Sequence, residues 1–151
     1  MSIFEGLLRK LGIRDRSARR TVRVFLLDDD ARRHDWFARR FNKGDELDVA
    51  VEPAQAIEML SQNSYDAIFL DHDLLPEHYH AESHDDTSTG YAVALWLAEH
   101  PEHQTASSIM VHTRNGDAAW RMVEELRRAG RQAEYVPFHM LAPMLKKYWH
   151  R

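Results

Sequence analysis

Cysteine is absent from the sequence. This excludes disulfide bonds, thiolate metal sites and cysteine nucleophiles, and it is compatible with a reducing compartment. No apolar run approaches the roughly 20 residues that a membrane-spanning helix needs. The start of the chain also lacks the basic-then-apolar order and the small-residue cleavage site of a secretory signal. We therefore expect a cytoplasmic protein without a transmembrane segment.

Positive charge is scarce after the first twenty residues. Residues 1–20 carry six Lys/Arg against two Asp/Glu, whereas the rest of the chain carries 14 against 22, a formal charge of -8. Extended nucleic-acid binding depends on many Lys and Arg contacts to phosphates, so an acidic body argues against it. Short RNA ends need few such contacts and stay open as partners.

A length of 151 residues is appropriate for one domain. Ser2 and Glu5 form a capping box before an apolar helical stripe, which predicts a short amphipathic helix over residues 2–12, followed by a basic linker to residue 20. This stripe either packs on the domain or a second copy, or binds a membrane surface. Its shortness favours packing, and we assign residues 21–151 to the domain itself.

Apolar segments alternate with segments of helical periodicity along the domain. The patterns predict strands at residues 22–27, 47–51, 65–70, 107–111 and 133–138. Helices are expected at residues 31–41, 54–60, 90–100, 115–130 and 143–149, with Thr89 as a cap and Gly130 as a stop. Strands too apolar to alternate cleanly indicate a parallel sheet covered on both faces. The expected fold is a flavodoxin-like α/β sandwich with strand order 2-1-3-4-5.

Acidic side chains follow two of the expected strands. Asp28, Asp29 and Asp30 close the first strand, and Asp71 and Asp73 close the third. Ligands of open α/β sheets bind beyond the carboxyl ends of the strands. Carboxylates that meet there repel one another, and a cation with oxygen ligands, Mg²⁺ or another divalent ion, relieves the repulsion. The alternative is a solvated acidic rim.

Two histidines lie at the same strand ends. His72 directly follows Asp71, and His112 directly precedes Thr113. Imidazole titrates near neutral pH, so two such rings facing one phosphate are able to act as acid and base. The alternative for each histidine is a packed or hydrogen-bonded structural role.

The motifs LLDDD, IFLDHDLLP, VHT and VPF resemble the receiver domain of two-component response regulators over about residues 22–149. By position, Asp28 and Asp29 match the acidic pair that holds magnesium. Asp71 matches the phosphate-accepting aspartate, and Thr113 matches the hydroxyl residue that contacts the phosphoryl group. The lysine that receivers place before a proline after the fifth strand is replaced by Val136. We therefore do not expect ordinary aspartyl-phosphate switching.

The set LDDDAR, FLDHDL and VHTRN is similar to the cyclic-phosphate processing receiver domain family, a lysine-less group for which action on 2′,3′-cyclic phosphate ends of RNA, in RNA repair, has been proposed. The resemblance implies that catalysis involves His72, His112 and Asp71. It implies a divalent metal among Asp28, Asp29 and Asp71, which alternatively orient the histidines. It also implies phosphate-binding side chains: Arg32, Thr113 and Asn115.

Two functions of different classes are consistent with these features. The first is an enzyme that acts on a phosphate ester, most concretely a cyclic phosphate at an RNA end. The second is a non-catalytic pseudo-receiver whose fourth helix and fifth strand bind a protein partner or a second copy of the chain. The loop at residues 77–88, with His78, His80 and His84, is either a lid or second metal site, or a solvated loop.

Overall fold

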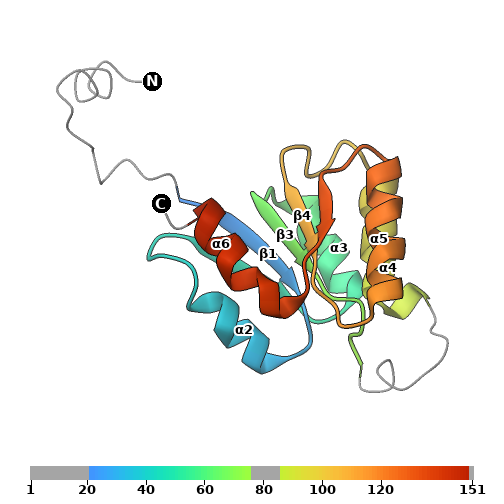
Figure 1. The fold of residues 1–151 in the computed structure, drawn as a ribbon. Helices are drawn as coiled ribbons and strands as arrows, with labels where there is room; N and C mark the ends of the chain where they lie inside the picture. Colours follow the sequence, from blue (N-terminus) through green and yellow to red (C-terminus); the bar gives the residue numbers. More distant parts are fainter. Residues whose placement is uncertain (1–20, 76–85, 150–151) are drawn as a thin grey trace, which may run out of the picture.

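The structure is a computed structural model that describes residues 21–75 and 86–149 (Figure 1). The helix predicted at residues 2–12 and most of the loop at residues 77–88 lie outside the described residues. Within the described part, no helix is both long enough and apolar enough to cross a membrane.

Five parallel strands form the sheet in the order β2-β1-β3-β4-β5, which confirms the predicted topology. The strands are β1 (Arg23–Leu27), β2 (Glu46–Ala50), β3 (Ala67–Leu70), β4 (Ser108–Val111) and β5 (Ala133–Tyr135). Each predicted strand is present, and the first four differ from prediction by two residues or fewer at either end.

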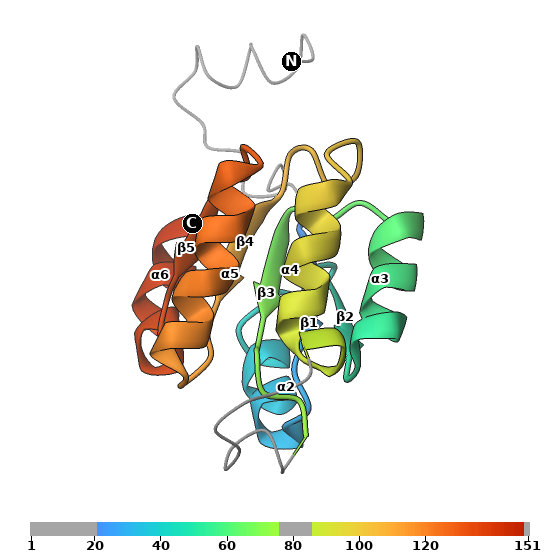
Figure 2. The same ribbon diagram turned by 90° about the vertical axis from the view of Figure 1, so that its right-hand side faces the viewer.

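Helices cover both faces of the sheet, as Figures 1 and 2 show. The α-helices are α2 (Ala31–Ala38), α3 (Pro53–Gln62), α4 (Gly90–Glu99), α5 (Gly116–Arg128) and α6 (Leu141–Trp149). The predicted cap is confirmed, because the Thr89 side chain accepts a hydrogen bond from the backbone of Tyr91. The predicted stop is confirmed as well: α5 ends just before Gly130, whose φ of 80° favours glycine.

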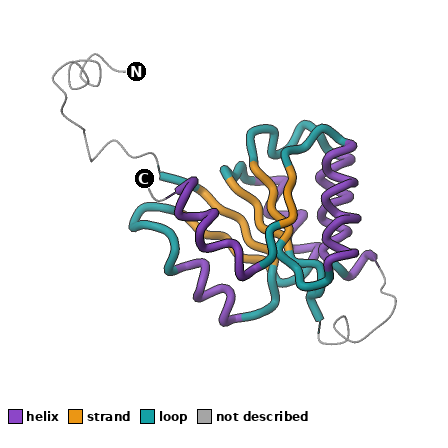
Figure 3. The backbone as a smooth tube through the Cα atoms, in the orientation of Figure 1, coloured by secondary structure: helices purple, strands orange, loops and turns teal. Residues whose placement is uncertain are grey.

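Helices lie on both sides of the sheet (Figure 3), and the apolar central strands β1, β3 and β4 are largely buried, as expected. Val24 and Leu26 of β1 pack on α2 and α6, where they meet Phe37. Phe25 and Leu27 point to the opposite face, which α3, α4 and α5 cover. Because successive side chains of a strand alternate, both sets lie in apolar cores and leave only the strand ends for polar groups.

The fifth strand is shorter than predicted. It ends at Tyr135 instead of continuing to residue 138. Val136 still donates its backbone N–H to Val111, but Pro137 has no N–H to donate and a 3₁₀ turn, Phe138–Met140, follows. The chain therefore leaves the sheet early and enters α6.

Candidate active site

Three polar side chains are in register at the carboxyl edge of the sheet. The last residues of β1, β3 and β4 are partners in the parallel ladder, and the residues that follow them are Asp28, Asp71 and His112. The ladder continues one step further, because Asp71 and His112 donate their backbone N–H groups to Leu27 and Leu70, 2.9 and 3.0 Å away. One ligand atom from each of the three side chains lies within 4.8 Å of the others.

Asp28 and His112 form a buried carboxylate–imidazole pair. The Nε2 of His112 lies 2.8 Å from Oδ2 of Asp28, and the two side chains are 1% and 0% exposed. The other ring nitrogen, Nδ1, is buried and has no hydrogen-bond partner among the described residues. Because an ionised carboxylate only accepts hydrogen bonds, Nε2 of His112 is the donor, and the neutral ring carries its lone pair on Nδ1. The pair therefore holds a proton acceptor in a fixed orientation.

Arg33 of α2 joins the two buried carboxylates. Its Nε and Nη2 donate to Oδ2 and Oδ1 of Asp28 at 2.7 and 2.8 Å, and Nη2 also donates to Oδ2 of Asp71 at 3.1 Å. Nη1 lies 3.3 Å from Asp30, and Nη2 lies 3.8 Å from Asp29. Arg33 therefore supplies the positive charge that the carboxylates face. Its side chain is 17% exposed, so it also forms part of the surface of the site.

The two carboxylates have different proton affinities. Burial raises the pKa of Asp71 from 3.8 to about 6, and the nearby negative charge of Asp28 adds to the rise. Burial alone would also raise the pKa of Asp28, but hydrogen bonds from His112 and Arg33 outweigh it and lower this pKa to about 2. Asp28 therefore stays ionised, whereas Asp71 binds a proton in mildly acidic solution.

His72 belongs to a second carboxylate–imidazole pair. Its Nδ1 lies 2.7 Å from Oδ1 of Asp73, and both residues are buried. The start of α4 packs directly on this turn: Gly90 donates its N–H to the carbonyl of His72 at 2.9 Å. A Cβ at Gly90 would lie 1.8 Å from the carbonyl oxygen of Asp71, so only glycine allows this approach.

The remaining residues predicted for the site lie around this centre. Thr113 is buried, and its hydroxyl accepts the backbone N–H of Asn115 at 3.2 Å. The Asn115 side chain caps α5 by accepting from the backbone of Ala118. Arg32 is exposed on α2, and its backbone N–H donates to Asp30. The three side chains that cluster are those of Asp28, Asp71 and His112. Asp29, which was predicted as a metal ligand, is not in this cluster.

Sequence reasoning missed Arg33 and the pairing of His72 with Asp73. A signal for Arg33 was present: it lies four residues before Phe37, so it shares the buried face of α2, whereas Arg32 does not. Its side chain also points toward the start of the helix, where the carboxylates lie. The Asp73 pairing depends on the turn after β3, which no periodicity predicts.

Asp28, Asp71 and His112 are residue types that bind metal ions. The Asp28 carboxylate, however, has no lone pair free for an ion. Oδ2 of Asp28 accepts from Arg33 and His112, and Oδ1 accepts from Arg33 and the backbone of Asp30. A carboxylate offers about four lone-pair sites, and all four are used. As arranged, Asp28 does not fit a divalent ion unless Arg33 moves away.

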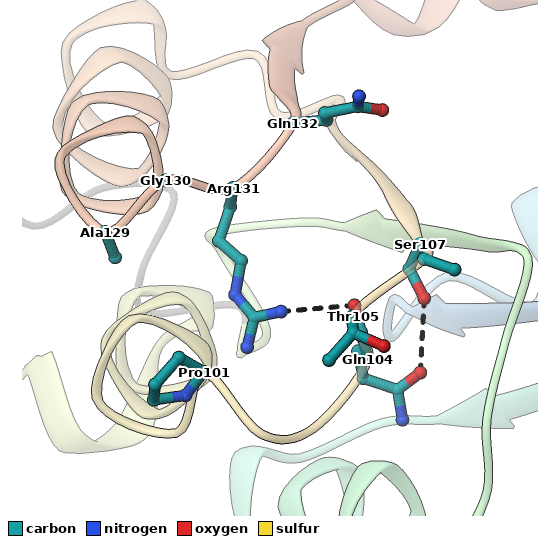
Figure 4. Close-up of a pocket in the computed structure, with 9 residues that line it drawn as sticks. Pro101, Gln104, Thr105, Ser107, Ala129, Gly130, Arg131 and Gln132 are labelled. Carbon is teal, nitrogen blue, oxygen red and sulfur yellow. Dashed lines mark hydrogen bonds between the residues drawn. The ribbon is translucent and has the colours of Figure 1, made fainter.

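A cavity of about 370 Å³ lies at the opposite edge of the sheet, among residues that precede β4 and β5 (Figure 4). Its side chains are occupied with holding the loops together. The Arg131 guanidinium donates to the carbonyls of Leu97, His100 and Gln104, and Ser107 donates to the Gln104 side chain. This cavity contains none of the residues predicted to be functional.

Comparison with solved structures places the fold among receiver domains. Similar structures include the signal receiver domain of a putative Luxo repressor protein from Vibrio parahaemolyticus, with a TM-score of 0.61 and 16% identity over 85% of this chain and 86% of that one. A CheY-like receiver domain from Methanospirillum hungatei gives a TM-score of 0.59 and 16% identity over 85% and 93% of the two chains. The receiver domain of a Pseudomonas aeruginosa sensor histidine kinase, which holds a magnesium ion in its active-site cleft, gives 0.58 and 18% over 85% and 98%.

These likenesses show the fold, a receiver-type α/β domain. The family model described as the cyclic-phosphate processing receiver domain matches residues 22–128, so the chain belongs to that family. This confirms the resemblance seen in the sequence. A comparison with curated proteins finds no significant match.

Proposed function

We propose that this domain hydrolyses a cyclic phosphodiester, with His112 as the general base. The observation that carries the proposal is the buried Asp28–His112 pair, in which the carboxylate holds Nε2 and Nδ1 has no partner among the described residues. In many hydrolases a carboxylate likewise holds one ring nitrogen of the histidine that activates the nucleophile, although there the carboxylate holds Nδ1 and the base is Nε2. Membership of the cyclic-phosphate processing family supports the choice of substrate.

The proposed reaction is addition of water across one ester bond. Nδ1 of His112 is buried in this conformation, so the site must open before Nδ1 takes a proton from water as the water oxygen forms a bond to phosphorus. One of the two ring P–O bonds breaks, and its oxygen receives a proton from His72, which Asp73 holds through Nδ1. The products are a phosphate monoester and a free hydroxyl group. Proton transfer by each histidine contributes typically about 10²–10⁴-fold to such a rate.

Arg33 provides the positive charge that the phosphate needs. The Arg33 side chain is 17% exposed and pairs with Asp28 and Asp71, and its planar guanidinium has the geometry that matches phosphate oxygens. It supplies a cation that Val136, half-buried in the apolar core near α6, does not. Arg32, Thr113 and Asn115, predicted to bind phosphate, stay as proposed contacts around this centre.

The charge of the chain favours a small substrate. With a formal charge of -8 over residues 21–151, the domain is poorly suited to holding an extended RNA. We therefore propose a nucleotide 2′,3′-cyclic phosphate, free or at a short RNA end, as the substrate. No step of the proposed reaction requires the magnesium or other divalent ion that the sequence predicts.

The test is phosphorus NMR of a nucleoside 2′,3′-cyclic phosphate incubated with wild type, His112→Ala and His139→Ala. His139 is exposed and serves as the matched histidine control. We expect wild type and His139→Ala to convert the cyclic ester signal into that of a monoester, and His112→Ala to leave it nearly unchanged. Absence of conversion by wild type would contradict the proposal.

A specific observation also favours the binding-module alternative. Trp120 of α5 is 49% exposed and contacts the Tyr135 ring of β5 edge-on, with ring centroids 6.1 Å apart. The Tyr135 hydroxyl donates to the carbonyl of Thr113 at 3.1 Å, which connects this surface to the site. Sedimentation of wild type and Trp120→Ala tests for self-association: a dimer lost in the variant supports the alternative, and monomers in both count against it.

A further inference from the structure

We propose that Arg33 is the resident cation of this site and occupies the position between Asp28 and Asp71 where a divalent ion would otherwise lie. The inference rests on the contacts of Arg33 and not on the proposed hydrolysis. It replaces the metal expected from the sequence with a group that the chain itself supplies.

The contacts of Arg33 cover the oxygens that a metal would need. Two of its nitrogens pair with the two oxygens of Asp28 at 2.7 and 2.8 Å, and one of them also reaches Oδ2 of Asp71 at 3.1 Å. Paired N–H groups on a carboxylate are among the strongest hydrogen bonds in proteins because both partners are charged. A divalent ion between Asp28 and Asp71 would compete for the same lone pairs.

The remaining lone pairs of Asp28 are also used. His112 takes the second position on Oδ2 and the backbone N–H of Asp30 takes the second position on Oδ1. Asp71 accepts the backbone N–H of His72 on Oδ1 at 2.8 Å. An ion would therefore have to break the Arg33 contacts before it gained two carboxylate ligands.

Charge leads to the same conclusion. A guanidinium stays protonated at every pH at which the protein folds, so the compensation by Arg33 is permanent. Its position is fixed by the local structure: Asp30 caps α2, accepts from the backbone of Arg32, and lies 3.3 Å from Nη1 of Arg33. The start of the helix thus places this side chain against the carboxylates.

The experiment is a titration of Mn²⁺ followed by the loss of its free electron paramagnetic resonance signal. It compares wild type, Arg33→Gln, the matched control Arg32→Gln, and Arg33→Gln combined with Asp71→Asn. We expect weak binding by wild type and Arg32→Gln, a gain of about tenfold or more in Arg33→Gln, and loss of that gain in the double variant. Equal affinity in wild type and Arg33→Gln would overturn the proposal.

A second measurement uses wild type alone, in case Arg33→Gln does not fold. Any ion that binds the native state raises the melting temperature. We expect millimolar MgCl₂ to leave the midpoint of wild type unchanged relative to NaCl of equal ionic strength. A rise that Asp71→Asn abolishes would show that the ion displaces Arg33 readily, and would overturn the proposal whether or not the protein hydrolyses cyclic phosphates.

Discussion

The side chains of Asp28 and His112 are joined by a 2.8 Å contact, although 84 positions separate them in the chain and β3 lies between their strands. The contact exists because the first residue beyond each strand stays in the ladder, so both side chains point to the same side of the sheet edge. The chemistry proposed here depends on this contact, since it decides which nitrogen of His112 carries the proton.

Asp28→Asn should change the protonation of His112. With the carboxylate in place we expect nitrogen NMR to show the neutral His112 ring protonated on Nε2, and hydrolysis to fall on the order of 10³-fold in the variant, because an amide does not stabilise the imidazolium. Asp29→Asn is the matched control, since Asp29 lies outside the buried cluster. Identical His112 spectra in wild type and Asp28→Asn would show that Asp28 does not set the tautomer.

Gly90→Ala should destabilise the domain and displace the turn that carries Asp71 and His72. The added Cβ would lie 1.8 Å from backbone, which is unable to yield as a flexible side chain does, so a loss of about 2 kcal/mol or more is expected. Gly116→Ala is the control, because nothing lies within 4 Å of its Cβ and alanine favours the helix. Urea unfolding of both variants measures the difference; equal stability would mean that α4 shifts freely.

Stability should depend on pH through Asp71. Because its pKa in the folded protein, about 6, lies above the usual 3.8, the native state takes up a proton between these values while the unfolded chain does not. Wild type should therefore gain stability relative to Asp71→Asn as the pH falls from 7 toward 4, by on the order of 1–3 kcal/mol. Urea unfolding across this range measures it. A pH-independent difference between the two proteins would contradict the assigned pKa.

Below about pH 4 the dependence should reverse. Asp28 has a pKa lowered to about 2, so its pairing with Arg33 and His112 contributes stability above the unfolded value and loses it as the pH falls toward 2. The two carboxylates thus give wild type a stability maximum in mildly acidic solution. Urea unfolding of wild type and Asp28→Asn between about pH 2 and pH 5 isolates the contribution of Asp28.

Much of the fold was predictable because the central strands β1, β3 and β4 are buried on both faces. Their unbroken apolar runs, separated by helical periodicity, specify a parallel sheet, and Thr89 and Gly130 mark helix boundaries by their own chemistry. The predicted end of β5 was wrong because Val136 and Phe138 are apolar, which fits a strand and a turn that packs against the core equally well. They pack in the core near α6 after the chain has left the sheet.

Predicting the site was harder, since it depends on single-residue register. The position of Asp28, Asp71 and His112 beyond strand ends was enough to expect them together. The choice between Arg32 and Arg33 depends on a rotation of about 100° around α2, which one apolar neighbour, Phe37, decides. His72 pairs with Asp73 within the turn on which Gly90 packs, and this pairing depends on the turn.

The central claim is that the two histidines act as one catalytic unit on a cyclic phosphate. Its most direct test is the rate of hydrolysis of a nucleoside 2′,3′-cyclic phosphate by wild type, His72→Ala, His112→Ala and the double variant, with circular dichroism to confirm folding. We expect each single variant to lose about 10²–10⁴-fold and the double variant to fall little further, because groups that act as a unit are not additive. Unchanged turnover in both folded single variants would contradict the account.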